Sequence, residues 1–118
     1  MQSSKEIIKQ SMPRHEVLAQ LAEECAELGQ AALKLRRTLN PDASPTNTTK
    51  QEANGHFREE VADVLLTLTI ALDGDITIAA KGDITYIMAQ KRERWAKRLM
   101  DAGRVKDHGC NPNYCELE

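Results

Sequence analysis

The chain has 118 residues, which suffices for one compact domain and is too short for two independent ones. Aromatic residues make up only 3% of the chain and the net charge is −2 with mixed signs, so the composition favours packed helices and excludes a strongly basic nucleic-acid surface or polybasic membrane patch. With no long apolar run and no secretory signal, we expect a cytoplasmic protein that binds neither membrane nor nucleic acid.

The first strongly periodic segment is predicted to form a helix from about Pro13 to Thr38, after an N-terminal extension at 1–12. Proline suits the first helical turn, and Asn40-Pro41 ends the pattern. Apolar residues recur at steps of three and four, which is typical of a face that packs against another helix. They are Leu18, Leu21, Cys25, Leu28, Ala32 and Leu35.

A loop is predicted at 40–55, because this segment holds two prolines and several Thr, Asn and Ser residues. A loop of this length in a small domain is often functional. The second helix is expected to begin at Gln51 or His56 and to end at Leu72, with a second apolar face of the same kind. This face consists of Phe57, Val61, Val64, Leu68 and Ala71.

The third helix is predicted to begin at Asp83 as its N-cap, and to end at Met100 or Ala102 before Gly103. The preceding residues 76–82, ITIAAKG, suit a short strand or a turn of helix, and the lack of a partner strand favours the turn. The helical domain therefore spans 13–103.

Residues 104–118 form a C-terminal tail without periodicity. Its Cys110, Cys115 and His108 lack a fourth ligand at a recognised zinc spacing, so a solvated tail is the favoured interpretation. Other faces of the helices also carry apolar residues, such as Leu66 and Ile70. The total apolar surface is therefore larger than a single chain of this length can bury. We therefore expect an all-α bundle of three to four helices, completed by homo-oligomerisation as a homodimer or homotetramer.

Acidic residues accompany both apolar faces. On the first helix Glu24 lies about 70° from the centre of the face and Glu27 about 130°, whereas Glu23 points nearly away. On the second helix the corresponding angles are about 80° and about 140°, for Glu60 and Asp63, and Glu59 points away. Antiparallel packing of the two helices would gather four carboxylates, namely Glu24, Glu27, Glu60 and Asp63.

Four unpaired negative charges near a core repel one another, so cationic side chains or a metal ion must neutralise them. Ligation by oxygen alone suits Mg²⁺ or Mn²⁺. A di-iron site would instead require Glu-x-x-His pairs, which neither motif contains. The alternative is that these acids form solvated faces with i,i+4 partners among nearby Lys and Arg residues.

The sequences Glu23-Glu24-Cys25-Ala26-Glu27 and Glu60-Val61-Ala62-Asp63 read EExxE and ExxD. This pair resembles the motifs of the all-α nucleoside triphosphate pyrophosphatases, the MazG-like family. The segments LAEECAELGQAALKLRR, EEVADVLL and KRERWAKRL extend the resemblance over about residues 15–100, to small single-domain members including those of phages. The motifs are 32 residues apart, more than is usual, and the extra length falls in the predicted loop.

The resemblance implies a Mg²⁺-dependent enzyme, with Mn²⁺ as a substitute, that cleaves a nucleoside triphosphate to the monophosphate and pyrophosphate in nucleotide-pool sanitation or regulation. It assigns the metal to Glu24, Glu27, Glu60 and Asp63, and a second-shell or water-orienting role to Glu23. The alternatives are a non-catalytic oligomerisation or nucleotide-binding module and a phosphoribosyl-ATP pyrophosphatase-like hydrolase.

Cleavage of this bond also needs cations for the charge that builds on the leaving group. Lys91 lies about 30° from the centre of the third helix's apolar stripe, with Arg94 and Arg98 at its edge. Lys34 lies beyond the first acid motif on the same face. These four are the candidate phosphate-binding residues, although a long lysine stem also reaches solvent from a buried stripe. The preferred base is not specified by the sequence.

Overall fold

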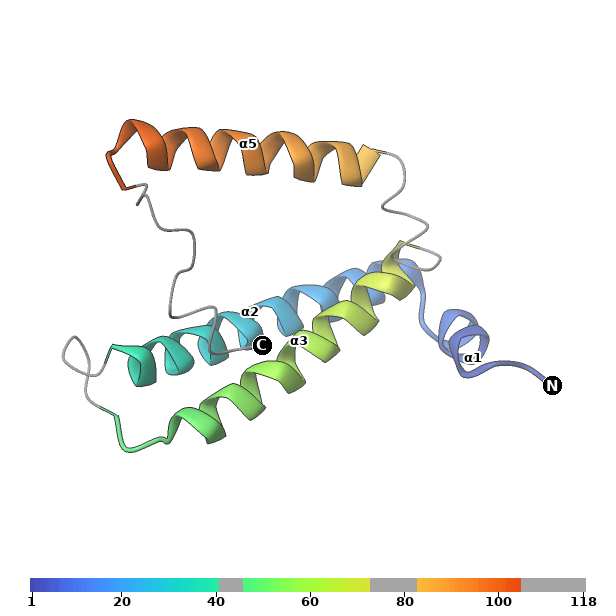
Figure 1. The fold of residues 1–118 in the computed structure, drawn as a ribbon. Coiled ribbons are helices and arrows are strands. Elements are labelled where there is room, and N and C mark those ends of the chain that lie inside the picture. Colours follow the sequence, from blue (N-terminus) through green and yellow to red (C-terminus); the bar gives the residue numbers. More distant parts are fainter. Residues whose placement is uncertain (41–45, 73–82, 105–118) are drawn as a thin grey trace. The chain divides into compact units, whose positions relative to one another are not determined.

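The computed structural model describes residues 1–40, 46–72 and 83–104. Within these ranges the regular elements are four helices, with no strand, which confirms the predicted all-α class (Figure 1). They are α1 (Ser4–Ser11), α2 (Arg14–Leu39), α3 (Lys50–Ala71) and α5 (Thr85–Asp101). The chain divides into two units, the first containing α1, α2 and α3 and the second containing α5. No described helix combines the length and apolarity needed to cross a membrane.

Two capping boxes set the starts of α1 and α3. The Thr49 hydroxyl accepts a hydrogen bond from the Glu52 backbone N–H at 3.1 Å, and the Glu52 carboxylate accepts one from the Thr49 N–H at 3.4 Å. Ser3 and Glu6 make the same pair of contacts before α1. Because each box satisfies two otherwise unpaired backbone donors, it fixes where the helix begins. Of the two predicted starts of the second helix, Gln51 agrees with the structure to within one residue and His56 does not. The predicted loop at 40–55 is therefore wrong for residues 50–55, and the extension at 1–12 contains a helix.

The bounds of α2 confirm the predicted first helix. The Pro13 carbonyl accepts hydrogen bonds from the N–H groups of Glu16 and Val17 at 2.9 and 3.1 Å, so this proline opens the helix. At the other end the Asn40 N–H donates to the Arg36 carbonyl at 3.0 Å, and the helix ends at Leu39, so that the residue before Pro41 is its non-helical C-cap. A residue that precedes proline is disfavoured in helical geometry, which explains the stop.

The two ends of α5 differ in how well the sequence predicts them. The predicted N-cap Asp83 is wrong, because Ile84 precedes the helix with helical angles (φ −65°, ψ −46°) and no side chain caps it. The predicted stop at Gly103 is confirmed: this glycine has φ +68°, and Arg104 N–H donates to the Leu99 carbonyl at 2.9 Å. Glycine adopts this left-handed geometry without strain. The predictions for 76–82 and for the cysteine tail lie outside the described residues.

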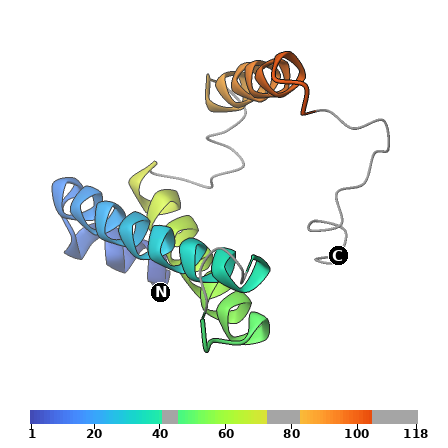
Figure 2. The same ribbon diagram turned by 90° about the vertical axis from the view of Figure 1, so that its left-hand side faces the viewer.

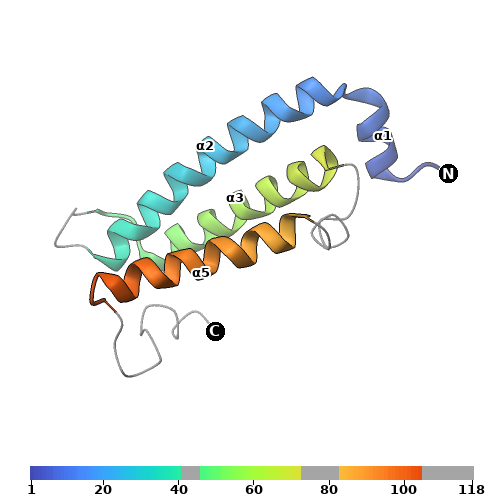
Figure 3. The same ribbon diagram turned by 90° about the horizontal axis from the view of Figure 1, so that it is seen from above.

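Helices α2 and α3 run antiparallel and pack side by side along their lengths, as three views agree (Figure 1, Figure 2 and Figure 3). Their buried apolar residues are small: Val17 and Ala31 on α2, and Ala53 and Ala71 on α3. Small side chains at a helix–helix contact let the two backbones approach closely. Carboxylates on the two helices can therefore reach one another across the contact.

The packing face of α2 is rotated from the predicted one. Leu18 is 47% exposed and Cys25 is exposed, although both were placed on the predicted face. The more buried positions of α2 instead recur at steps of four and three as Val17, Leu21, Glu24, Leu28, Ala31 and Leu35. On α3 the corresponding positions are Ala53, Phe57, Glu60, Val64, Thr67 and Ala71. An acid thus lies on the packing face of each helix, not beside it.

Candidate metal centre

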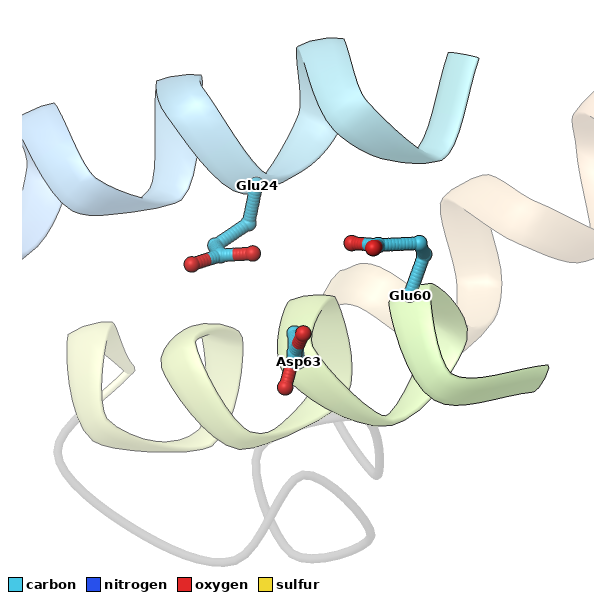
Figure 4. A group of neighbouring side chains, drawn as sticks. All are labelled: Glu24, Glu60 and Asp63. Carbon is cyan, nitrogen blue, oxygen red and sulfur yellow. The ribbon is translucent and has the colours of Figure 1, made fainter. Parts of the chain in front are cut away.

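Three carboxylates meet at the middle of the α2–α3 contact. Glu24 comes from α2, and Glu60 and Asp63 come from successive turns of α3 (Figure 4). One oxygen of each lies within 4.8 Å of the others. Because hard divalent cations bind oxygen at about 2.0 to 2.6 Å, two ligands of one ion lie up to about 5 Å apart. The three oxygens therefore have the spacing of a shared cation site.

The inner part of this cluster is buried. Glu60 is only 9% exposed and Glu24 is of intermediate burial, whereas Asp63 is exposed. The Oε2 atoms of Glu24 and Glu60 are both buried, and neither has a hydrogen-bond partner among the described residues. A buried carboxylate oxygen without a donor is unfavourable, because it has lost its water and gained nothing in exchange. A cation between the two helices would satisfy both atoms.

The other oxygen of each inner glutamate has a polar neighbour on its own helix. Gln20 Nε2 donates to Glu24 Oε1 at 2.6 Å. His56 Nε2 lies 3.8 Å from Glu60 Oε1. Both neighbours occur four residues before the glutamate they approach, which places them one turn away on the same face. The acidic motifs do not include Gln20 and His56, and the spacing of four residues before each glutamate is the signal in the sequence that identifies them.

Glu27, one turn after Glu24, belongs to the edge of the same cluster. Its pKa is raised above the ordinary value of 4.5, first by the negative charge of Glu24 and then by that of Glu60, with smaller contributions from burial and hydrogen bonding. Across the described ranges, no lysine or arginine forms an ion pair with Glu24, Glu27, Glu60 or Asp63. Within the described residues, the repulsion among these acids is therefore largely uncompensated by positive charge.

The remaining predicted site residues are not brought into the cluster. Glu23 is exposed on α2 and lies outside the group of converging oxygens, and Lys34 is exposed on the same helix. Lys91, Arg94 and Arg98 are exposed on α5, where all three line one hollow along the helix. Helix α5 belongs to the second unit, whereas the acids belong to the first.

The solvated-face alternative does not fit the inner acids. An exposed i,i+4 pair of that kind occurs on α5, where Lys97 Nζ lies 3.0 Å from Asp101 Oδ2. Glu60 is instead nearly buried, and among the described residues the one basic side chain within 4.0 Å of its carboxylate is His56. All the side chains of the cluster that could ligate a metal are carboxylates, which suit a hard cation such as Mg²⁺ or Mn²⁺.

Comparison of the chain with protein-family models, with curated proteins and with solved structures finds no match. The resemblance to the MazG-like family therefore depends on the two acidic motifs and the amino-acid sequence around them. Two features of the fold are compatible with it: both motifs lie on helices, and these helices pack against each other with the acids between them.

Proposed function

We propose that the chain is a Mg²⁺-dependent nucleoside triphosphate pyrophosphohydrolase of the MazG-like type, releasing a nucleoside monophosphate and pyrophosphate. The observation that carries the proposal is the pair of buried, unpartnered Oε2 atoms of Glu24 and Glu60, which lie on two helices within one carboxylate cluster. The cluster supports the metal, and the order EExxE then ExxD supports the reaction. Mn²⁺ is expected to substitute, because it prefers the same ligands.

In this proposal Glu24, Glu60 and Asp63 hold the metal and Glu27 completes the set at its exposed edge. A bound Mg²⁺ would neutralise phosphate oxygens and lower the pKa of a bound water. The two helices fix the carboxylates, so little rearrangement is needed when substrate arrives. Glu23, exposed next to Glu24, has the freedom to orient the attacking water.

The basic residues would bind the triphosphate. Lys91, Arg94 and Arg98 share one side of α5 with Trp95, which is 62% exposed. Exposed guanidinium and ammonium groups suit phosphate oxygens, and an exposed indole suits stacking on a base. Lys34 on α2 is a further candidate of the same kind.

We also propose that the chain assembles as a homodimer or homotetramer. Four leucines on the α2–α3 pair support this, because Leu18, Leu33, Leu65 and Leu66 are 47, 54, 46 and 58% exposed. The described residues include no large side chain that is fully buried. Contact with a second copy would remove these leucines from water, at about 25 cal/mol for each Å² of apolar surface.

The reaction is tested by incubating the full chain with a panel of canonical and modified nucleoside triphosphates and Mg²⁺. We expect at least one substrate to yield monophosphate and pyrophosphate in equal amounts, measured by ion-exchange chromatography, and EDTA to abolish the release. Glu60→Gln should reduce the rate by about 100-fold or more, since it removes a buried ligand charge. Glu59→Gln is the matched control, because Glu59 is exposed and lies outside the cluster.

Turnover of no substrate, or release of inorganic phosphate in place of pyrophosphate, would contradict the proposed reaction. Equal rates for Glu60→Gln and Glu59→Gln would show that the cluster does not carry it. Nucleotide binding without turnover would favour the binding module that the sequence left open.

A further inference from the structure

We propose that Gln20 and His56 are positioning residues, which hold the carboxylates of Glu24 and Glu60 so that one oxygen of each is presented to the metal. The inference rests on the metal site proposed above and adds to it the groups that set its geometry. Neither residue belongs to the acidic motifs, and neither is an acid itself.

The arrangement around the two glutamates repeats on the two helices. Gln20 Nε2 is 2.6 Å from Glu24 Oε1, and His56 Nε2 is 3.8 Å from Glu60 Oε1. In each glutamate one carboxylate oxygen faces this nitrogen, and the other is buried without a hydrogen-bond partner among the described residues. On each of α2 and α3, a side-chain nitrogen one turn before the glutamate thus lies near one carboxylate oxygen and leaves the other free to bind a metal.

Such a contact has a physical consequence for metal binding. A glutamate has three side-chain torsions, and a donor on one carboxylate oxygen reduces the freedom of the terminal group. Metal-binding carboxylates are commonly hydrogen-bonded in this way, and loss of the outer partner lowers metal affinity by about 10- to 100-fold. A glutamine, or an imidazole that carries its proton on Nε2, supplies a donor without a full positive charge. The negative charge of the cluster is therefore left for the cation.

The two contacts differ in tightness. Gln20 is of intermediate burial and its hydrogen bond is short. The His56 side chain is 47% exposed, and about 1 Å of movement would bring its Nε2 to hydrogen-bond distance from Glu60. We therefore expect the larger loss of metal affinity when Gln20 is replaced.

Binding of Mn²⁺ alone to the full chain tests the proposal, with free Mn²⁺ measured by electron paramagnetic resonance. Gln20→Met and His56→Phe keep an apolar body of similar length and remove the donor. We expect each to weaken Mn²⁺ binding by about tenfold or more. His56→Gln should restore binding to near the wild-type value, because its amide nitrogen takes the place of Nε2. The matched controls are Gln30→Met and His15→Phe, at exposed positions of α2.

The outcomes separate this inference from the proposed function. Wild-type affinity in both Gln20→Met and His56→Phe, with binding lost in Glu60→Gln, would overturn the positioning role and leave the metal site standing. Equal loss in His56→Phe and His56→Gln would make the imidazole itself a ligand and would also overturn it. No Mn²⁺ binding by the wild-type chain would contradict both proposals.

Discussion

The ends and the middle of the α2–α3 contact are built from opposite kinds of residue. The buried residues are Val17 and Ala71 toward one end and Ala31 and Ala53 toward the other, and all four are small and apolar. In the middle the corresponding positions hold Glu24 and Glu60. The ends stabilise the pair by burying apolar surface, whereas the middle places like charges together in a region with few donors. The difference supports the proposal that the middle binds a metal ion, whereas the ends provide the stability.

The largest expected effect comes from making the middle resemble the ends. Glu60→Leu keeps a similar volume but removes a nearly buried charge that repels its neighbours. We expect the metal-free chain to gain up to about 4 kcal/mol in free energy of unfolding, as apolar replacements of buried charges do. Urea unfolding in EDTA measures the change, and a loss of stability would contradict the account.

Mg²⁺ should stabilise the middle of the contact without altering the ends. At a concentration of 100 times its Kd, a ligand that binds only the folded chain adds about 2.7 kcal/mol. We expect a gain of this size for the wild-type chain in thermal unfolding. Glu60→Gln should respond far less, and an equal response from both would place the metal elsewhere.

Enlarging a buried alanine at one end tests the close approach of the helices. Ala31 is 0% exposed, so Ala31→Leu should destabilise the chain by about 1 to 3 kcal/mol through overpacking. The neighbouring Ala32 is exposed, and Ala32→Leu should change the stability by less than about 0.5 kcal/mol. Urea unfolding measures both changes, and a larger loss in Ala32→Leu than in Ala31→Leu would show that α2 packs through the face that the sequence first indicated.

The smallest effect concerns pH and Glu27. Because Glu24 and Glu60 raise its pKa above 4.5, the folded chain retains a proton that the unfolded chain has already released. Stability of the metal-free chain should therefore fall as pH rises from 4.5 through the raised pKa. Glu27→Gln should lose less stability over this interval, as pH-dependent thermal unfolding would show. A steeper loss in the variant would contradict the assigned repulsion.

The sequence predicts helix ends well where a backbone rule applies. Pro13, Asn40-Pro41 and Gly103 each act through fixed dihedral angles or a missing donor, and the structure confirms all three. The start of α3 was uncertain by several residues, although Thr49 and Glu52 have the spacing of a capping box. Local chemistry of this kind does not depend on the rest of the fold.

The packing face was less predictable, because apolar periodicity favours large side chains. It selected Leu18 and Cys25, which are exposed, and it missed the positions of Val17 and Ala31. Because the predicted faces were centred on the large apolar side chains, Glu24 and Glu60 were placed beside them, whereas both lie on the packing face. On α3 the predicted face is confirmed, since Phe57, Val61, Val64, Leu68 and Ala71 are all buried or of intermediate burial. Convergence of the acids could still be predicted, because the rotation of the face is confined to α2. The roles of Gln20 and His56 required side-chain geometry.

Diffraction from crystals soaked in Mn²⁺ would test the central claim most directly, because anomalous scattering locates the ion without reference to activity. The expected result is a peak within about 2.0 to 2.6 Å of carboxylate oxygens from Glu24, Glu60 and Asp63. A peak only at other carboxylates, or none at this cluster at a concentration that saturates the chain in solution, would contradict the account.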